Sequence, residues 1–505
     1  MDVVYIVGPV ILIAVVLAAM WLDRWSVPVI LIALAAGICF GSDVLNLWNF
    51  DNIALTNQVA NLALVFILFY GGFSTKRADF KNVALPAGGL ATWGVALTAA
   101  VTFVVLHFGF GWAFDKAILL AVIVSSTDAA AIFSILRRQS LPKKLSSTVE
   151  IESAANDPMA ILLTVAVVEM LTGSQQPVPM MALSFLWQFG AAPLLGWAIA
   201  RGAVWVFNNL TPQDRGHFYV LTLGIVLLVF GIAQLIGTSG MLAVFITGYV
   251  IGNRSFVHKQ GVANFSSAIA TIANIGMFVL LGLQVFPRQW ANIWQEGILL
   301  FLVLTFVARP LAVWISTLGM RLSWKYKLFI SWAGLRGAVP IVLATYPMAA
   351  GLAVGNEIFN LVFFAVLLSV AFQGGSLGAL ARGLKLTVPA RPRPLFHLEL
   401  VTMAASDLDM IVIDLPGPRN KTGPCIAELN LPQGAVITLI TRGKELVIPK
   451  GSTLLKGWDQ VSVLAHANEE GNIRSLLMQA FEPPPPKQDD VDTPAALEIK
   501  TKSTL

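Results

Sequence analysis

The chain has 505 residues, of which 56 % are hydrophobic and only 12 % are charged. This composition excludes an ordinary soluble globular protein and makes the lipid bilayer the main solvent. The formal net charge of +5 comes from basic residues dispersed between apolar runs, so no nucleic-acid partner is expected. Two cysteines cannot supply a spaced zinc site, and no phosphate loop or nucleophile triad indicates an enzyme or a cofactor.

Apolar runs follow one another from residue 3 to about residue 384. A membrane-spanning helix needs roughly 20 apolar residues. The sequence therefore predicts an all-α polytopic membrane protein with about thirteen spans, near residues 3–22, 26–41, 57–73, 84–108, 116–136, 148–171, 181–208, 217–237, 239–253, 263–286, 295–319, 326–350 and 357–381.

The basic residues between the spans fall mainly in alternate loops, whereas the opposite loops contain only Lys116 and Arg288. Cytoplasmic loops of membrane proteins carry an excess of Lys and Arg. We therefore expect a multi-pass protein of the cell inner (plasma) membrane, with the N-terminus outside and the C-terminal region in the cytoplasm.

The composition changes after Gly383. The predicted organisation is a transmembrane domain at 1–385, a linker at 386–395, a small α+β cytosolic domain at 396–481 and a disordered tail at 482–505, which contains a run of four prolines. Strands are expected at 397–403, 410–414, 435–441, 445–448 and 460–465, and short helices near 424–429 and 469–480.

Ionisable groups inside spans are costly and are read as functional by default. The fifth span contains Ser125, Ser126, Thr127 and Asp128, whose small hydroxyl groups favour a break in the helix that exposes backbone carbonyls to a cation.

The sixth span contains Glu152, Ser153, Asn156, Asp157 and Pro158. Ser153 and Asp157 share a helix face, and Pro158 removes one backbone donor beside Asp157. Asp157 is the candidate ion and proton site, Ser153 is a candidate ligand, and Asn156 supports the site.

The twelfth span contains the sequence Gly-Leu-Arg-Gly-Ala-Val-Pro at 334–340, which favours an interrupted helix around a buried guanidinium. Arg336 needs an opposite charge, and Glu152 or Asp128 is the expected partner. Arg309, toward one end of the eleventh span, is expected to extend to the membrane interface.

These three segments, in this order, resemble the cation/proton antiporter superfamily, in the branch of bacterial sodium/proton and potassium/proton exchangers. The resemblance covers roughly residues 1–385. It implies a homodimer with inverted repeats, and a moving core in which spans five and twelve cross as broken helices. It also implies that Asp157 binds ion or proton, that Ser153 and the Thr127 backbone help to coordinate the ion, and that Asp128 and a Glu152–Arg336 pair are structural.

One partly desolvated carboxylate accounts for exchange, because a proton and a monovalent cation compete for it. Asn156, rather than a second aspartate, precedes Asp157, so electroneutral exchange is the simplest expectation. A sodium/proton antiporter is the alternative to a potassium/proton antiporter. A regulated cation channel is a further alternative, although the sequence has no Thr-Val-Gly-Tyr-Gly filter, and a membrane sensor without transport is another.

The segments 423–432 and 448–459 resemble the C-terminal half of potassium-conductance regulator domains, also called RCK-C or TrkA-C domains. This resemblance favours potassium as the transported ion and a role in pH homeostasis. It implies dimerisation and, as in some relatives, binding of a regulatory nucleotide such as cyclic di-AMP. A ligand-free dimerisation module is the alternative.

Overall fold

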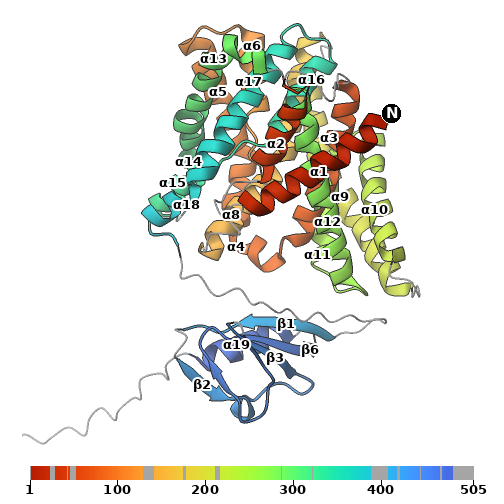
Figure 1. The fold of residues 1–505 in the computed structure, drawn as a ribbon, viewed down its shortest axis with the longest axis vertical. Coiled ribbons are helices and arrows are strands. Elements are labelled where there is room, and N and C mark those ends of the chain that lie inside the picture. Colours follow the sequence, from red (N-terminus) through yellow and green to blue (C-terminus); the bar gives the residue numbers. More distant parts are fainter. Residues whose placement is uncertain are drawn as a thin grey trace, which may run out of the picture. The chain divides into compact units, whose positions relative to one another are not determined.

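A computed structural model describes residues 2–22, 29–41, 44–45, 53–128, 141–173, 178–210, 216–285, 287–320, 322–387, 408–417, 421–443, 445–466 and 469–481. The described residues divide into two compact units, a helical one up to residue 387 and a smaller one from residue 408 (Figure 1). The predicted strand at 397–403 and the predicted tail at 482–505 lie outside the described residues.

The helical unit consists of apolar helices joined by short connections. In chain order they are α1 (Asp2–Leu22), α2 (Val29–Phe40), α3 (Ile53–Ser74), α4 (Arg77–Gly89), α5 (Val95–Val104), α6 (Phe114–Ile123), α8 (Lys143–Leu171), α9 (Val178–Asn209), α10 (Gly216–Leu235), α11 (Gly240–Gly252), α12 (Lys259–Leu283), α13 (Trp290–Leu302), α14 (Arg309–Ser316), α15 (Trp324–Trp332), α16 (Ala338–Ala349), α17 (Gly355–Leu368) and α18 (Gly375–Gly383).

Several predicted spans are composite. Four π-helical turns, η2 (Leu90–Gly94), η3 (Val105–Gly109), η5 (Val303–Ala308) and η6 (Ser369–Gly374), extend or join neighbouring helices into continuous rods. Within the described residues eight helices are long and apolar enough to cross a membrane, and four shorter apolar helices accompany them. The predicted all-α polytopic fold is confirmed, with the fifth span described only as far as residue 128.

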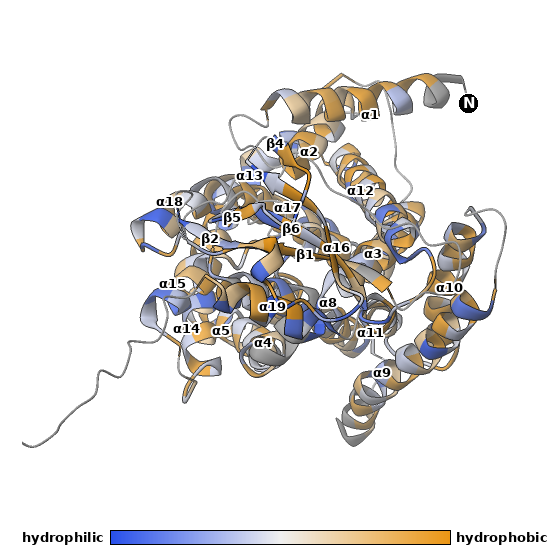
Figure 2. Ribbon diagram, turned by 90° about the horizontal axis from the view of Figure 1, so that it is seen from below, coloured by the Kyte–Doolittle hydropathy of each residue, from blue (hydrophilic) through white to orange (hydrophobic). Residues whose placement is uncertain are grey.

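The outer surface of the helical unit is apolar, as a bilayer requires. Leu183 and Leu194 of α9 and Val220 and Leu235 of α10 are all more than 60 % exposed. Figure 2 shows hydrophobic residues on the outward faces of α1, α9 and α10. A helix that is apolar all round fits a membrane span rather than a water-exposed surface.

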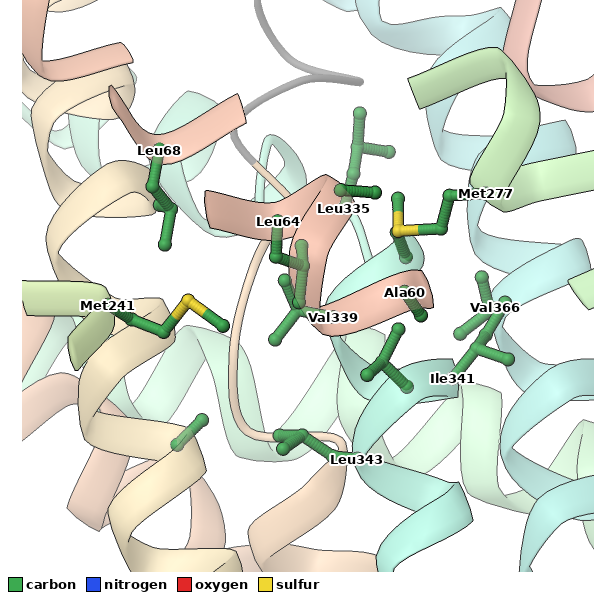
Figure 3. Packing of buried hydrophobic residues seen from close by; sticks show 14 of the residues in the cluster. Ala60, Leu64, Leu68, Met241, Met277, Leu335, Val339, Ile341, Leu343 and Val366 are labelled. Atoms are coloured by element: carbon green, nitrogen blue, oxygen red, sulfur yellow. The ribbon is translucent and has the colours of Figure 1, made fainter. Parts of the chain in front are cut away.

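Two groups of helices pack mainly among themselves. In one group, α3 packs against α11 and α12, α12 also packs against α2, and α9 packs on α11. In the other, α4, α6 and α16 pack on α8, and α13 and α16 pack on α17. The groups meet where α16 contacts α3 and α12 and where α8 contacts α3 and α11. Figure 3 shows Leu64, Met241, Met277, Val339 and Val366 from α3, α11, α12, α16 and α17 in the buried core.

Glycine permits the close approach of α3 and α11. A Cβ on Gly72 would lie 2.1 Å from the carbonyl oxygen of Phe245, and one on Gly248 would lie 2.2 Å from that of Phe69. Close backbone contact at small residues is how helices associate where lipid removes the hydrophobic drive between them.

The second unit is a small α+β fold. Its four-stranded antiparallel sheet has the order β1-β6-β3-β4, formed by β1 (Leu408–Asp414), β6 (Gln460–His466), β3 (Val436–Arg442) and β4 (Glu445–Val447). A second sheet pairs β2 (Thr422–Cys425) with β5 (Leu454–Lys456), and α19 (Glu470–Gln479) packs its apolar face into the same core. The sequence did not predict β2 and β5, which are short, and the helix expected near 424–429 is a single 3₁₀ turn at Ile426–Glu428.

Candidate functional site

Inside the helical unit, the end of one helix meets the interruption between two others. Helix α6 ends at Ile123, and residues 124–128 continue without helical structure; α15 ends at Trp332, and residues 333–337 separate it from α16. The backbone N–H of Asp128 donates to the carbonyl of Leu335 at 2.8 Å. Small hydroxyl residues in one break and glycines in the other allow the backbone to leave the helix.

Asp128 and Gly337 lie in direct contact. The Asp128 carboxylate accepts a hydrogen bond from the N–H of Ala338 at 3.2 Å, at the first turn of α16. A carboxylate there stabilises the positive end of the helix dipole. A Cβ at position 337 would lie 1.5 Å from Oδ2 of Asp128, so only glycine fits this contact.

Polar side chains of helix α8 lie against residues 124–128, which follow α6. The Ser153 hydroxyl lies 2.8 Å from the Thr127 hydroxyl, and Nδ2 of Asn156 donates to Thr127 Oγ1 at 2.6 Å. The same amide nitrogen donates to Oε1 of Glu152 at 3.0 Å. All four side chains are completely buried. Thr127 therefore contributes its side-chain hydroxyl to this cluster, whereas coordination of an ion by its backbone stays a prediction.

Three buried oxygens in this region have no hydrogen-bond partner among the described residues: Oδ1 of Asp157, Oδ1 of Asn156 and Oγ of Ser126. Asp157 is only 3 % exposed. The two donor bonds of Asn156 fix its amide nitrogen toward Glu152 and Thr127, which leaves its oxygen as an acceptor. Buried oxygens without donors are unusual, and carboxylate and amide oxygens are the ligands that hard cations take.

The expected ion pair between Glu152 and Arg336 is wrong. Oε2 of Glu152 instead accepts from Nη2 of Arg309 at 2.9 Å, and both side chains are at most 1 % exposed. The expectation that Arg309 extends to the interface is wrong for the same reason. Arg309 follows directly after η5. A buried guanidinium is stabilised by pairing with a buried carboxylate, so the side chain does not need to extend through lipid to the interface.

Arg336 has a different role in the same network. Its Nη1 donates to the backbone carbonyls of Ser126 at 2.6 Å and Ser125 at 3.2 Å. These carbonyls belong to the break after α6, where helical partners are missing. Arg336, in the break between α15 and α16, therefore binds the backbone that follows α6.

Six of the seven residues singled out from the sequence take part in the hydrogen bonds at or beside these helix ends: Thr127, Asp128, Glu152, Ser153, Asn156 and Arg336. The seventh, Asp157, is buried on α8 directly after Asn156. Sequence reasoning named Arg309 but did not place it in the polar network, although an arginine inside the apolar stretch 290–316 was a usable signal. Its position near the expected end of the span concealed it.

Residues 11–383 match the family model described as "Sodium/hydrogen exchanger, transmembrane". This match covers well over half of the chain and all of the site. The chain belongs to the sodium/hydrogen exchanger family. Like this family, it is a multi-pass membrane transporter that exchanges monovalent cations for protons.

Curated members of the sodium/hydrogen exchanger family resemble nearly the whole chain. The K(+)/H(+) antiporter NhaP2 of Shewanella sp. (strain ANA-3) is 36 % identical over 481 residues, which are 95 % of this chain and 84 % of the relative. The K(+)/H(+) antiporter NhaP of Alkalimonas amylolytica is 32 % identical over 480 residues, 94 % of this chain and 83 % of the relative.

The fold also matches a solved structure. The sodium proton antiporter MjNhaP1 from Methanocaldococcus jannaschii, at pH 8, aligns with a TM-score of 0.67 at 22 % identity and covers 76 % of this chain and 99 % of that one. At this identity the likeness shows that the exchanger fold is shared.

Proposed function

We propose that this chain is an electroneutral potassium/proton antiporter in which K⁺ and H⁺ compete for Asp157. One observation carries the proposal: a buried carboxylate, with an oxygen that has no partner among the described residues, lies near the end of α6 and the interruption between α15 and α16. Interrupted helices near the centre of a transporter are where coupling ions bind, because their free backbone groups replace water around the ion.

The charge balance around Asp157 supports one-for-one exchange. Among the described residues of this network, Arg309 and Arg336 carry two positive charges, and Glu152 and Asp128 carry two negative charges. These four charges cancel among the described residues, and a proton or a monovalent cation on Asp157 would each neutralise the remaining carboxylate. An ionised, empty Asp157 would leave one buried charge uncompensated, which is costly. The empty carrier is therefore disfavoured, and the two fluxes are coupled.

Alternating access would occur where the two helix groups meet. Asn57 and Asn61 of α3 contact α16: Nδ2 of Asn57 donates to the Thr345 hydroxyl at 2.8 Å, and the Tyr346 hydroxyl donates to Oδ1 of Asn61 at 3.3 Å. A contact between uncharged side chains can form and break at modest cost. The inward-facing and outward-facing states would differ in the contacts at this boundary. The protein would lie in the inner (plasma) membrane of the cell, with its N-terminus outside and its second unit in the cytoplasm.

Potassium is favoured by the names of the relatives that align over almost the whole chain. Sodium is the alternative, because the Na(+)/H(+) antiporter NhaG of Bacillus atrophaeus is 29 % identical over 301 residues, 56 % of this chain and 56 % of the relative. The deciding experiment uses proteoliposomes with an acidic interior and a fluorescent pH probe. Added K⁺ should collapse the gradient at lower concentration than Na⁺ or Li⁺. The reverse order would replace potassium by sodium, and no collapse with any of these ions would overturn antiport.

The second unit would act as a regulatory RCK-C-like domain that dimerises and binds a nucleotide such as cyclic di-AMP. Support comes from its small α+β fold and from the segments 423–432 and 448–459. Equilibrium dialysis of the full-length protein with labelled cyclic di-AMP tests this role. Saturable binding would support it, whereas the absence of binding would favour a ligand-free dimerisation module.

A further inference from the structure

The break between α15 and α16 leaves several backbone groups without helical partners, and two of them are bonded by neither Asp128 nor Arg309. The carbonyl of Trp332 closes α15, and the N–H of Arg336 lies just before α16 begins at Ala338. At a helix end such groups need other partners, and inside a membrane protein the surrounding protein or an enclosed water must supply them.

Two side chains of η6 satisfy both groups. The hydroxyl of Ser369 accepts from the N–H of Arg336 at 3.0 Å and donates to Oε1 of Gln373 at 2.5 Å. Nε2 of Gln373 then donates to the carbonyl of Trp332 at 3.3 Å. The chain of bonds runs from one side of the break to the other, and Ser369 and Gln373 are at most 2 % exposed.

The π-helical form of η6 (Ser369–Gly374) is part of this arrangement. A π turn inserts an extra residue into a helix and often marks a functional site. Here both polar side chains of the turn lie against the neighbouring break rather than against lipid. An apolar residue at either position would pack in the membrane equally well, so packing does not explain the serine and the glutamine.

A small cavity adjoins the break. It is lined by Thr305, Gly334, Arg336, Ser369 and Gln373 together with apolar side chains, and its volume of about 10 Å³ is close to the least that one water needs. Nη2 of Arg336 is buried without a hydrogen-bond partner among the described residues. The cavity therefore has room for about one water beside Arg336.

We infer that Ser369 and Gln373 are positioning residues for the cation site, a role that rests on the proposed antiport at Asp157. They fix the backbone of Arg336, whose side chain holds the carbonyls of Ser125 and Ser126. The next residue, Thr127, carries the hydroxyl that contacts Ser153 and Asn156. The geometry of the cation ligands thus depends on a turn that does not contact the ion.

The test compares Ser369→Ala, Gln373→Leu and the conservative Ser369→Thr with Ser331→Ala. Ser331 is equally buried, but its hydroxyl donates to the Lys327 carbonyl within α15, so it is a matched control. Antiport in proteoliposomes is measured at several pH values for K⁺ and Na⁺, and KM is separated from the maximal rate. Thermal unfolding of each variant is recorded alongside.

We expect Ser369→Ala to raise KM for the preferred cation roughly tenfold, equivalent to about 1.4 kcal/mol, and to change the K⁺/Na⁺ ratio of KM. Gln373→Leu should raise KM by a smaller factor. Ser369→Thr keeps a hydroxyl and should have the KM of the unmodified chain, as should Ser331→Ala. Unchanged KM values, or a lower Tm without a change in KM, would overturn the inference.

If Ser369→Ala does not fold, Gln373→Leu decides the question alone. The unmodified chain separates this inference from the proposed function. Absence of cation/proton exchange in the unmodified chain overturns both, whereas normal exchange with unaffected variants overturns only the positioning role.

Discussion

Nη2 of Arg309 lies 2.9 Å from Oε2 of Glu152, although 157 residues separate them. The other oxygen of Glu152 accepts from Asn156, the neighbour of Asp157. A buried ion pair therefore supports the residue next to the proposed ion site. This contact links η5 and α14 to the middle of α8.

Breaking that pair should destabilise the protein. Arg309→Met leaves the buried Glu152 carboxylate without its guanidinium, which costs about 3–5 kcal/mol. The double variant Arg309→Met with Glu152→Met removes both charges and should recover most of the loss. Thermal unfolding in detergent measures both. A single variant as stable as the unmodified protein would show that the ion pair is not needed.

The contact of Gly337 with Asp128 allows no side chain. Gly337→Ala forces the Asp128 carboxylate or the break to move, because the added Cβ would lie 1.5 Å from Oδ2. We expect antiport to fall by roughly tenfold or more, since small displacements at a site are costly. Gly224→Ala in α10, where a Cβ meets nothing within 4 Å, is the control. Equal rates for the two variants would contradict this reading of the crossing.

Asp157→Asn should abolish exchange for every cation and at every pH, because the amide neither takes up a proton nor carries the charge that attracts a cation. Glu169→Gln, an exposed position on the same helix, should exchange normally. The collapse of an imposed pH gradient in proteoliposomes is the measurement. Persistent collapse with Asp157→Asn would remove this carboxylate from the mechanism.

Exchange should move no net charge, because the proposed occupants of Asp157, one proton or one monovalent cation, carry the same charge in opposite directions. Proteoliposomes adsorbed on a solid-supported membrane report charge movement after a K⁺ jump. The current should not exceed that of Asp157→Asn, while a pH probe in the same vesicles still reports proton release. A sustained current of the unmodified protein would show an electrogenic cycle.

In the second unit, the Asp459 carboxylate is hydrogen-bonded to one residue of β3 and one residue of β5. Its carboxylate accepts from Nε and Nη2 of Arg442 at 2.9 and 2.8 Å and from the N–H of Lys456 at 2.9 Å. Asp459→Asn should cost about 1–3 kcal/mol, visible as faster hydrogen exchange in β3 and β6 of the full-length protein. Asp414→Asn, at an exposed hydrogen bond to Gln460, is the control.

Titration of Arg442 should not change the stabilisation by the Arg442–Asp459 contact at pH values near neutrality. The hydrogen bond to Asp459 raises the pKa of the Arg442 guanidinium. A group whose pKa is raised on folding contributes fully below its unfolded pKa and loses the contribution only as the pH passes through its folded pKa. For arginine both values lie far above neutrality, so protection of β3 and β6 should be equal at pH 6 and pH 8 unless another group titrates.

The sequence alone determined that the protein lies in a lipid bilayer and which segments form its membrane-spanning helices. Apolar runs of membrane length predicted the spans, and hydroxyls, glycines and carboxylates inside them predicted both helix breaks and the polar cluster around Asp157. These features are local, because insertion cost and backbone conformation depend on neighbouring residues along the chain.

Only the tertiary structure decided which charges pair and what holds the breaks. Glu152 had Arg336 as its expected partner, yet Arg309, the first residue of α14, pairs with it instead. Ser369 and Gln373 gave no local signal, because a lone serine or glutamine in an apolar helix is common. Their roles arise from contacts between residues far apart in the chain, which packing alone specifies.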